Sequence, residues 1–365
     1  MIERLRQTLK YRALQLLPMR RVSATQPIKA RHRLLFVFPG RTGEWRGMGQ
    51  QLYRQEPVFR HAIRRCSRVV EECLGWSLDE EFIKNKSTYR LHNHKPYTPI
   101  ALSAVQLALC ELWRDRGVEP DGVIGFSAGE FVAAYAAGGL TFDDAMLLAC
   151  GLYGPTQRFN EVHNKLIFIP MSLAQAESLC QEAPAPLYVL TEIGPSTVVL
   201  TWQDNDTQTV ASFLHDHGIQ SRALNVRSDF HTPLVERWKA AWLHDSRNLR
   251  PLPLRRACYS SANGNRVDQR TVFDSSYWWI VLSRPILYAS TLRVALADGY
   301  DTVLFISANP VLTESVVQTA SLLEKKVATF CSMRSDVPER VMWENARRDL
   351  RARGFGRIEP KSSSM

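Results

Sequence analysis

The sequence lacks any apolar run long enough to cross a membrane, a span that requires about 18 uninterrupted apolar residues. Its N-terminal segment also lacks the apolar core, about 7–15 residues long, of a secretory signal. With 365 residues, of which 45% are hydrophobic and 22% charged, the chain can bury a large core. We therefore expect a cytoplasmic protein without a membrane span, built as one large domain with an insertion or as two unequal domains.

Paired cysteines are also missing. The seven cysteines are widely scattered, none belongs to a CxxC motif, and no histidine cluster accompanies them at the spacing of metal ligands. This pattern predicts buried thiols in a reducing compartment, without a metal site or a disulfide. The cysteines are Cys66, Cys73, Cys110, Cys150, Cys180, Cys258 and Cys331.

Acidic residues are nearly absent from residues 1–33, where nine Lys and Arg stand against Glu3 alone. This basic N-terminal extension carries a local charge of +8, which leaves only +2 of the net +10 for the rest of the chain. A nearly neutral body does not favour a nucleic acid as partner. Three interpretations of the extension stay open: a solvated segment, a docking arm for an acidic partner, or an organelle-targeting peptide.

Apolar strands and helical patterns alternate through most of the chain, which is typical of an α/β sheet. The predicted strands lie at 34–40, 122–125 and 302–307, and the predicted helices lie at 48–75 (interrupted by Pro57), 97–117 and 337–358. Residues 164–226 follow a different order: strand, helix, strand, strand, helix, strand. This βαββαβ order predicts a ferredoxin-like insert within a large domain made of residues 34–163 and 227–355, followed by a flexible tail at 356–365.

The sharpest local signal is a GxSxG motif over residues 125–129, with an apolar strand before it and a helical pattern after it. That context is typical of a nucleophile elbow, in which flanking glycines allow a tight turn and expose the hydroxyl of Ser127. The N-terminus of the following helix offers backbone N–H groups to a developing oxyanion. A serine nucleophile needs a base, but none of the nine histidines is singled out by its sequence alone. His215 and His217 are expected on the surface of a helix in the insert.

Several segments, in order, resemble the acyltransferase domains of modular polyketide synthases and the malonyl-CoA:acyl carrier protein transacylases. The similarity covers roughly residues 34–355 and implies an α/β-hydrolase-like large domain with the ferredoxin-like insert. The opening segment FVFPGRTGEWRGMG resembles the family's FPGQGSQW…GM, and SDFHTP corresponds to its histidine-bearing AFHSP segment. The elbow segment GVIGFSAGEFVAAYAAGGLTFDDA and the closing segment with SANPVLT complete the resemblance.

The resemblance implies roles for individual residues. Ser127 is the expected nucleophile and His231 its general base, oriented by a backbone carbonyl near Asn309 rather than by an Asp. The backbone N–H groups of Arg41 and Ala128 are the expected oxyanion hole. Ser127 then takes an acyl group from an acyl-CoA or phosphopantetheine-bound thioester and passes it to an acyl carrier protein, and His231 moves the proton. No bound cofactor is implied.

One departure from the family concerns the substrate. Members that load malonyl or methylmalonyl groups hold an arginine 25 residues after the nucleophile, where it pairs with the free carboxylate. Counting from Ser127 places Leu152 there, and leucine cannot pair a carboxylate. Phe126 stands where the family has His, and Phe230, typical of malonyl-type members, loses that meaning without the arginine. These residues predict a pocket for a non-carboxylated acyl group, although Arg41 could restore anion binding.

The functional alternatives stay open at this stage. The chain is expected to be a discrete acyltransferase that meets its carrier in trans, since ketosynthase and carrier sequences are absent from it. The acceptor could be a carrier-protein thiol or another group, such as a hydroxyl of a natural product. An editing acyl hydrolase of the same fold is the second interpretation, and an inactive scaffold is the third. The arginine-rich C-terminal helix predicts either attraction of an acidic carrier or an ordinary solvated face.

Overall fold

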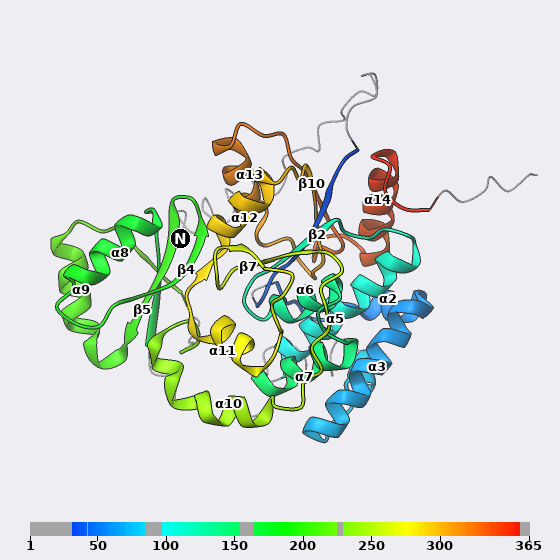
Figure 1. Ribbon diagram of the computed structural model, residues 1–365, viewed down its shortest axis with the longest axis horizontal. Coiled ribbons are helices and arrows are strands. Elements are labelled where there is room, and N and C mark those ends of the chain that lie inside the picture. Colours follow the sequence, from blue (N-terminus) through cyan, green and yellow to red (C-terminus); the bar gives the residue numbers. More distant parts are fainter. Residues whose placement is uncertain (1–30, 42, 85–96, 154–163, 225–228, 358–365) are drawn as a thin grey trace, which may run out of the picture. The chain divides into compact units, whose positions relative to one another are not determined.

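The computed structural model describes residues 31–41, 43–84, 97–153, 164–224 and 229–357 (Figure 1). From His32 onward, the described residues form one compact unit. The predictions for the basic extension and the flexible tail fall largely outside the described residues. The two junctions of the insert, at 154–163 and 225–228, also lie outside them.

A six-stranded sheet forms the centre of the large domain. Its order is β11-β10-β1-β2-β7-β8, and all neighbouring pairs are parallel except β7 and β8. Helices connect the parallel strands, as such a sheet requires. The strands are β1 (Leu34–Phe38), β2 (Gly122–Gly125), β7 (Ala257–Ser260), β8 (Asn265–Arg266), β10 (Thr302–Phe305) and β11 (Ala328–Cys331).

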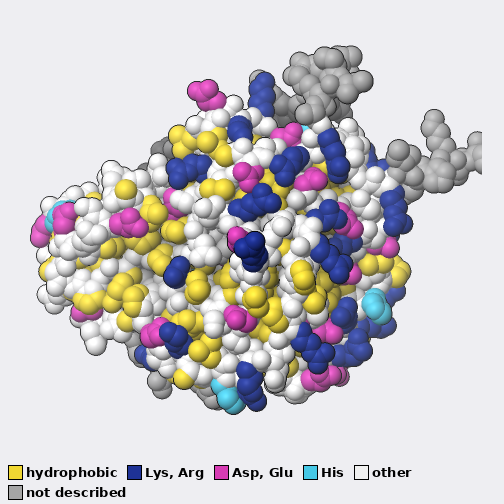
Figure 2. All heavy atoms as spheres, viewed as in Figure 1, with side chains coloured by type: hydrophobic (Ala, Val, Ile, Leu, Met, Phe, Trp, Pro, Cys, Tyr) yellow, Lys and Arg dark blue, Asp and Glu magenta, His cyan; other side chains and the backbone are white. Residues whose placement is uncertain are grey.

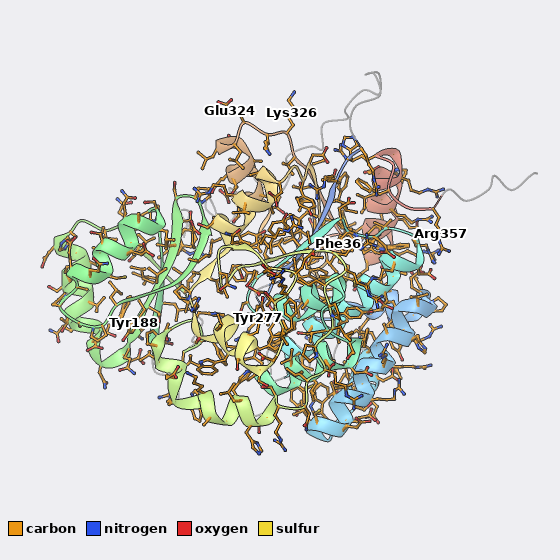
Figure 3. The ribbon with its side chains drawn as sticks, viewed as in Figure 1. Phe36, Tyr188, Tyr277, Glu324, Lys326 and Arg357 are labelled. Atoms are coloured by element: carbon orange, nitrogen blue, oxygen red, sulfur yellow. The ribbon has the colours of Figure 1, made fainter. Side chains whose placement is uncertain are left out.

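Strand β1 is buried on both faces, which explains its uninterrupted apolar sequence. Leu34, Phe36 and Phe38 pack into one core cluster, whereas Leu35 and Val37 pack into another on the opposite face. Figure 3 shows Phe36 surrounded by other side chains. The helices of the large domain are α2 (Gln50–Gln55), α3 (Pro57–Leu74), α4 (Leu78–Ile83), α5 (Tyr97–Asp115), α6 (Gly129–Ala137), α7 (Phe142–Tyr153), α10 (Lys239–Asp245), α11 (Ser275–Ser283), α12 (Tyr288–Ala297), α13 (Thr313–Leu322), α14 (Glu339–Ala352) and the 3₁₀ helix Pro233–Trp238.

The helix predicted over 48–75 is two helices. Glu56 is extended and ends α2, and Pro57 occupies the first turn of α3. Proline is favoured at that position because the missing N–H would have no partner within the helix. Pro57 therefore starts a helix and does not interrupt one.

The insert has the predicted ferredoxin-like arrangement. Its strands follow the order β6-β3-β5-β4, with antiparallel neighbours, and its two helices are α8 and α9. The two-residue strand β9 (Ile286–Leu287), which comes from the large domain, adds a fifth strand parallel to β4. Main-chain pairing thus attaches the insert to the large domain. The elements are β3 (Asn164–Ile169), α8 (Leu173–Glu182), β4 (Tyr188–Gly194), β5 (Thr197–Gln203), the 3₁₀ helix Asp204–Asp206, α9 (Thr207–Asp216) and β6 (Arg222–Leu224).

The exposure of the cysteines differs in part from the prediction, whereas that of two histidines agrees with it. All seven cysteines are free thiols, but Cys73 is exposed and Cys180 is half-buried, so the prediction that the thiols are buried is wrong for these two. His215 and His217 are exposed, as predicted. In the part of the chain that the structure describes, no helix combines the length and hydropathy that crossing a membrane requires.

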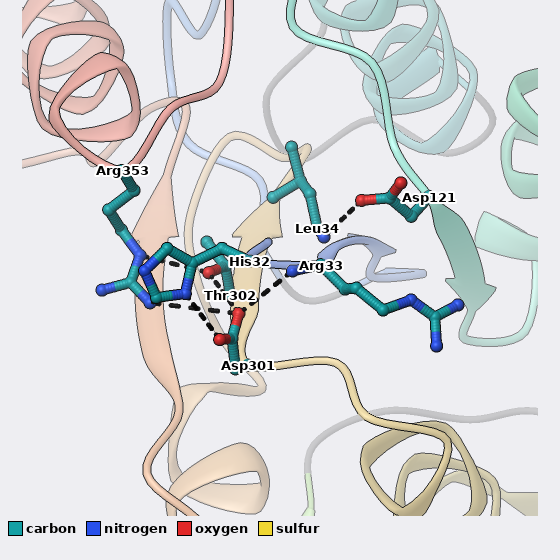
Figure 4. A network of polar contacts seen from close by, with 7 residues as sticks. All are labelled: His32, Arg33, Leu34, Asp121, Asp301, Thr302 and Arg353. Carbon is teal, nitrogen blue, oxygen red and sulfur yellow. Dashed lines mark hydrogen bonds and ion pairs between the residues drawn. The ribbon is translucent and has the colours of Figure 1, made fainter. Parts of the chain in front are cut away.

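Side-chain pairs connect the amino ends of the strands (Figure 4). His32 Nδ1 lies 2.6 Å from Asp301 Oδ2, and the other oxygen of that carboxylate accepts a hydrogen bond from the Arg33 backbone N–H. Arg353, directly after α14, donates to Thr302 Oγ1 over 3.1 Å. We call these five residues (His32, Arg33, Asp301, Thr302 and Arg353) the amino-end network. It joins β1 and β10 to the end of α14.

Candidate active site

Ser127 stands on a strained turn between β2 and α6. Its φ angle is 54°, in the left-handed region that residues other than glycine rarely adopt. Three glycines make the turn possible. A Cβ on Gly129 would lie 2.0 Å from Phe38 O, one on Gly125 would lie 2.4 Å from Glu130 Cα, and one on Gly40 would lie 2.6 Å from Phe126 O. The elbow predicted from GxSxG is thus built by close backbone approaches.

His231 lies next to the serine. Its Nε2 is 2.8 Å from Ser127 Oγ, although 104 positions separate the two residues in sequence. His231 is also in the left-handed region, with φ 66°, and its backbone N–H donates to Leu282 O over 2.8 Å. The structure therefore brings the two predicted residues together and fixes the histidine by its main chain.

A backbone carbonyl faces His231, as predicted, but the residue predicted to lie nearby, Asn309, is wrong. The Nδ1 of His231 lies 3.1 Å from the carbonyl oxygen of Arg284, just after α11. Asn309 instead donates through Nδ2 to Gly43 O and accepts through Oδ1 from the Ser335 backbone N–H. It therefore holds the loop after β1 against the loop after β10. The signal for Arg284 is absent from the sequence, because any residue type supplies a carbonyl.

The carbonyl partner determines which nitrogen of His231 carries the proton. A carbonyl only accepts, so Nδ1 is protonated and the neutral Nε2 can accept the Ser127 proton. Burial lowers the pKa of His231 from 6.5 to about 4, and the hydrogen bonds to the backbone of Arg284 and Val281 oppose this only in part. His231 is 4% exposed. Near neutral pH the ring is therefore uncharged, as a general base must be.

The candidate oxyanion hole lies around the same turn. Ala128 precedes the first hydrogen bonds of α6, which Gly129 and Glu130 donate to Phe126 and Ser127 carbonyls, so its N–H is not used by the helix. Arg41 follows Gly40, whose Cβ position would be 3.3 Å from Ser127 Cβ, so the Arg41 backbone passes beside the serine. Their role as oxyanion donors stays a prediction.

The predicted substrate-binding residues differ in their surroundings. Leu152 is 2% exposed and packs in the same core cluster as Ala128. Phe126 is half-buried and contacts Tyr288 edge-on, with ring centroids 5.6 Å apart. Phe230 is half-buried at the edge of the core beside His231, with centroids 6.5 Å apart. Phe126 and Phe230 thus place apolar groups next to Ser127 and His231, and Leu152 lies in the buried core.

A further residue, Glu130, was not singled out by the sequence. Its side chain is 4% exposed, three residues after the candidate nucleophile, and its carboxylate accepts hydrogen bonds from Ser260 Oγ, Ser261 Oγ and the Ala262 N–H. An acidic residue at the start of an otherwise apolar helix was the available signal. Within the described residues, no group of three or more His, Cys, Asp and Glu side chains could hold a metal ion.

Comparison with known proteins identifies the family. The acyl transferase domain family matches residues 35–355 of the chain. The chain belongs to this family. Its acyl transferase domain is 31% identical over 290 residues to the spectinabilin polyketide synthase system protein NorA of Streptomyces orinoci, covering 80% of the chain. It is 28% identical over 283 residues to erythronolide synthase EryA2 of Saccharopolyspora erythraea, covering 78%. The matches span only 15% and 8% of these two relatives.

Solved structures agree with the domain architecture. A loading acyltransferase from the avermectin modular polyketide synthase superimposes with a TM-score of 0.76 at 26% identity, over 87% of this chain and 99% of that one. The acyltransferase domain of the second salinomycin polyketide synthase module gives 0.79 at 26% identity, over 89% and 75%. At 20% identity, MCAT from Streptococcus pneumoniae shares the fold, with a TM-score of 0.72 over 82% and 95% of the two chains.

Proposed function

We propose that this acyl transferase domain carries an acyl group on Ser127 and delivers it to the thiol of an acyl carrier protein in polyketide or related biosynthesis. The observation that carries the proposal is the 2.8 Å contact between Ser127 Oγ and His231 Nε2. Family membership and the polyketide synthases among the relatives support the same reaction class.

The chemistry runs in two half-reactions. Ser127 Oγ attacks the carbonyl carbon of an acyl thioester while His231 Nε2 takes its proton, and the departing thiolate receives that proton. The acyl-serine is then attacked by the carrier's thiol, and the proton returns to Ser127 Oγ by way of His231. During both steps the negative carbonyl oxygen would be stabilised by the N–H groups of Arg41 and Ala128.

The acyl group that we propose has no free carboxylate. Leu152 is buried in an apolar core cluster, and an ionised carboxylate placed there would lose its hydration without gaining a cation. Acetyl, branched-chain, fatty or more elaborate acyl groups meet no such penalty. Phe126 and Phe230 supply further apolar surface beside the dyad.

Charge suggests which part of the molecule the carrier meets. The insert, residues 164–226, contains six acidic and two basic side chains. In the view of Figure 2, Lys and Arg side chains gather over the large domain and few lie over the insert. An acidic carrier protein would therefore be attracted to the large domain, an effect that raises the association rate and weakens with salt.

Intact-mass measurement of the acyl-enzyme tests the proposal. The protein is offered malonyl, acetyl, butyryl, octanoyl and branched acyl thioesters in separate reactions. We expect monocarboxylic groups to label the wild type, no group to label Ser127→Ala, and Leu152→Arg to gain malonyl labelling. Leu152→Met, which conserves volume and polarity, is the matched control and should keep the wild-type preference. Following the adduct with and without a carrier protein separates transfer from hydrolysis.

Arg41 supports a second candidate function, the transfer of malonyl-type groups. The Arg41 Nε is buried and has no hydrogen-bond acceptor among the described residues. A substrate carboxylate would satisfy it and would replace the pairing that Leu152 cannot provide. Under this alternative malonyl labels the wild type, and Arg41→Leu abolishes that labelling while sparing acetyl. Unchanged labelling by malonyl in Arg41→Leu would remove the alternative.

A further inference from the structure

Glu130 connects the helix of the nucleophile to the segment that supports the base. On one side, Glu130 lies in the first turn of α6. Its Cα packs so closely on Gly125 that a Cβ added to that glycine would lie only 2.4 Å away. On the other side, its Oε1 accepts from Ser261 Oγ over 2.6 Å and from the Ala262 N–H over 3.2 Å, while Oε2 accepts from Ser260 Oγ over 2.9 Å.

The turn that Glu130 holds is itself bonded to the next segment. The carbonyl of Ser261 accepts from the Leu287 N–H over 2.6 Å, and the carbonyl of Ser260 accepts from Thr291 Oγ1. Leu287 belongs to β9, which follows Arg284 by two residues, and the Arg284 carbonyl orients His231. Hydrogen bonds of 2.6–3.2 Å therefore run from Glu130 to Leu287 and Thr291, and the chain itself connects Leu287 to Arg284.

The same segment attaches the insert. Thr191 of β4 pairs with Ile286 of β9 and donates through Oγ1 to its carbonyl over 3.1 Å. A cavity of about 310 Å³ lies between the insert and the large domain, and its wall includes Asn263, Arg284 and Val189. Residues next to the Glu130 turn therefore line the space between the two parts.

We infer that Glu130 is a positioning residue, whose buried carboxylate fixes the Ser260–Ala262 turn and thereby the Arg284 carbonyl that orients His231 toward Ser127. The inference rests on the proposed function for the roles of Ser127 and His231 and does not depend on which acyl group is carried. The hydroxyl groups of Ser260 and Ser261 and the N–H of Ala262 all donate to the carboxylate, so its ionised form satisfies them best. A protonated carboxyl holds them more weakly and needs an acceptor for its own hydrogen.

Proton binding to Glu130 should therefore loosen the dyad near neutral pH. Burial raises the pKa of Glu130 from 4.5 to about 7, and its hydrogen bonds oppose that rise in part. Tyr277 of α11 (Figure 3) and Cys258 of β7 also face this carboxylate, and burial raises the pKa of both, so neither is charged in this range. His231, with its pKa lowered to about 4, does not titrate there either.

The test measures the rate at which a fluorophosphonate labels Ser127 between pH 5 and 9, after correction for labelling of Ser127→Ala. This probe forms a Ser Oγ–P bond with loss of fluoride and does not depend on the acyl preference. For the wild type we expect the rate to rise with pH through an inflection near 7. Glu130→Gln should lose that inflection and label up to about 100-fold more slowly at pH 8, because misplacing a catalytic group by about 1 Å can have such an effect.

A second variant tests the direction in which the inflection of the pH profile should move. Ser261→Ala keeps the carboxylate but removes a hydrogen bond that lowers its pKa, so the inflection should move to higher pH. Ser103→Ala is the control, since its buried hydroxyl donates to Pro99 O within α5, and it should leave the profile unchanged.

Two failures can be told apart. If the wild type is not labelled at any pH, the dyad and the proposed function fail. If the wild type is labelled but Glu130→Gln and Ser261→Ala keep both its rate and its inflection, the positioning role of Glu130 is wrong. Should Glu130→Gln fold poorly, the shifted inflection in Ser261→Ala still decides the matter.

Discussion

A histidine lies at each end of the central sheet, and the two histidines are held in place by different kinds of group. At the carboxyl ends, His231 is 4% exposed and its Nδ1 faces a backbone carbonyl. At the amino ends, the His32 side chain is 41% exposed and its Nδ1 faces the Asp301 carboxylate. A histidine paired with a carboxylate is common in catalytic sites, but the His32 ring lies against Asp301 and Arg353, neither of which is a nucleophile. Chemistry is expected where the backbone, not a charge, holds the ring.

This contrast separates two ways of fixing a side chain. The amino-end network uses side-chain charges that remain partly in water, where each contributes little to stability. The dyad uses buried carbonyls, tight glycines and two residues at positive φ, which leave it little room to relax. A backbone-built site should therefore tolerate substitution less than a charge-built network does.

The largest expected difference between the two ends is in activity. Ser127→Ala and His231→Ala should each reduce acyl-enzyme formation by about 10³-fold or more, the scale typical of losing a dyad member. His32→Ala, the matched control, should stay within about twofold, since it touches none of the reacting groups. Stopped-flow or quenched mass spectrometry measures all three rates. A comparable loss of rate in His32→Ala would contradict the view that only the histidine at the carboxyl ends takes part in catalysis.

The next difference is in stability at glycines. Gly129→Ala would place a Cβ 2.0 Å from the Phe38 carbonyl and should destabilise the fold by about 3 kcal/mol or more, if it folds at all. Gly151→Ala in α7 meets nothing within 4 Å and should stabilise by about 0.5–1 kcal/mol. Urea unfolding of both variants gives the two free energies. Equal effects would show that the close approach at Gly129 does not matter.

Acid should act on the buried histidine. Because the folded-state pKa of His231 is lowered from 6.5 to about 4, the unfolded chain binds a proton first as pH falls. Stability is therefore lost between about pH 6.5 and 4, by up to about 3 kcal/mol from this group. The stability advantage of the wild type over His231→Gln should shrink across that window. His32→Gln controls for removal of an imidazole, and an advantage over His231→Gln that does not change with pH would contradict the account.

The smallest expected effect is at the amino-end network. Asp301→Asn should lower the free energy of unfolding by about 1 kcal/mol at most, because both His32 and Asp301 are more than one-third exposed and solvent screens their attraction. The rate of acyl-enzyme formation should not change. Thermal unfolding at low and high salt measures the stability effect. A loss of several kcal/mol would show that solvent does not screen the attraction between His32 and Asp301.

The same contrast explains what the sequence could predict. Ser127 and the βαββαβ insert follow from glycine spacing and strand order, which are properties of residue type. The pairing of Ser127 with His231 follows from the family resemblance, since the sequence singled out none of the histidines. The Arg284 carbonyl could not be found, because a carbonyl carries no signature of its residue and 53 positions separate it from His231. The pairing of β9 with β4 was missed for a similar reason, since a two-residue strand has no periodicity.

The most direct test of the central account is a competition between two donors in one reaction. Equal concentrations of malonyl-CoA and butyryl-CoA are mixed with the wild-type protein, and the mass added to Ser127 is read in the first seconds. The account predicts butyryl on Ser127 in clear excess, because Leu152 offers no partner for a carboxylate. Malonyl in excess would contradict it and would make Arg41 the residue that selects the substrate.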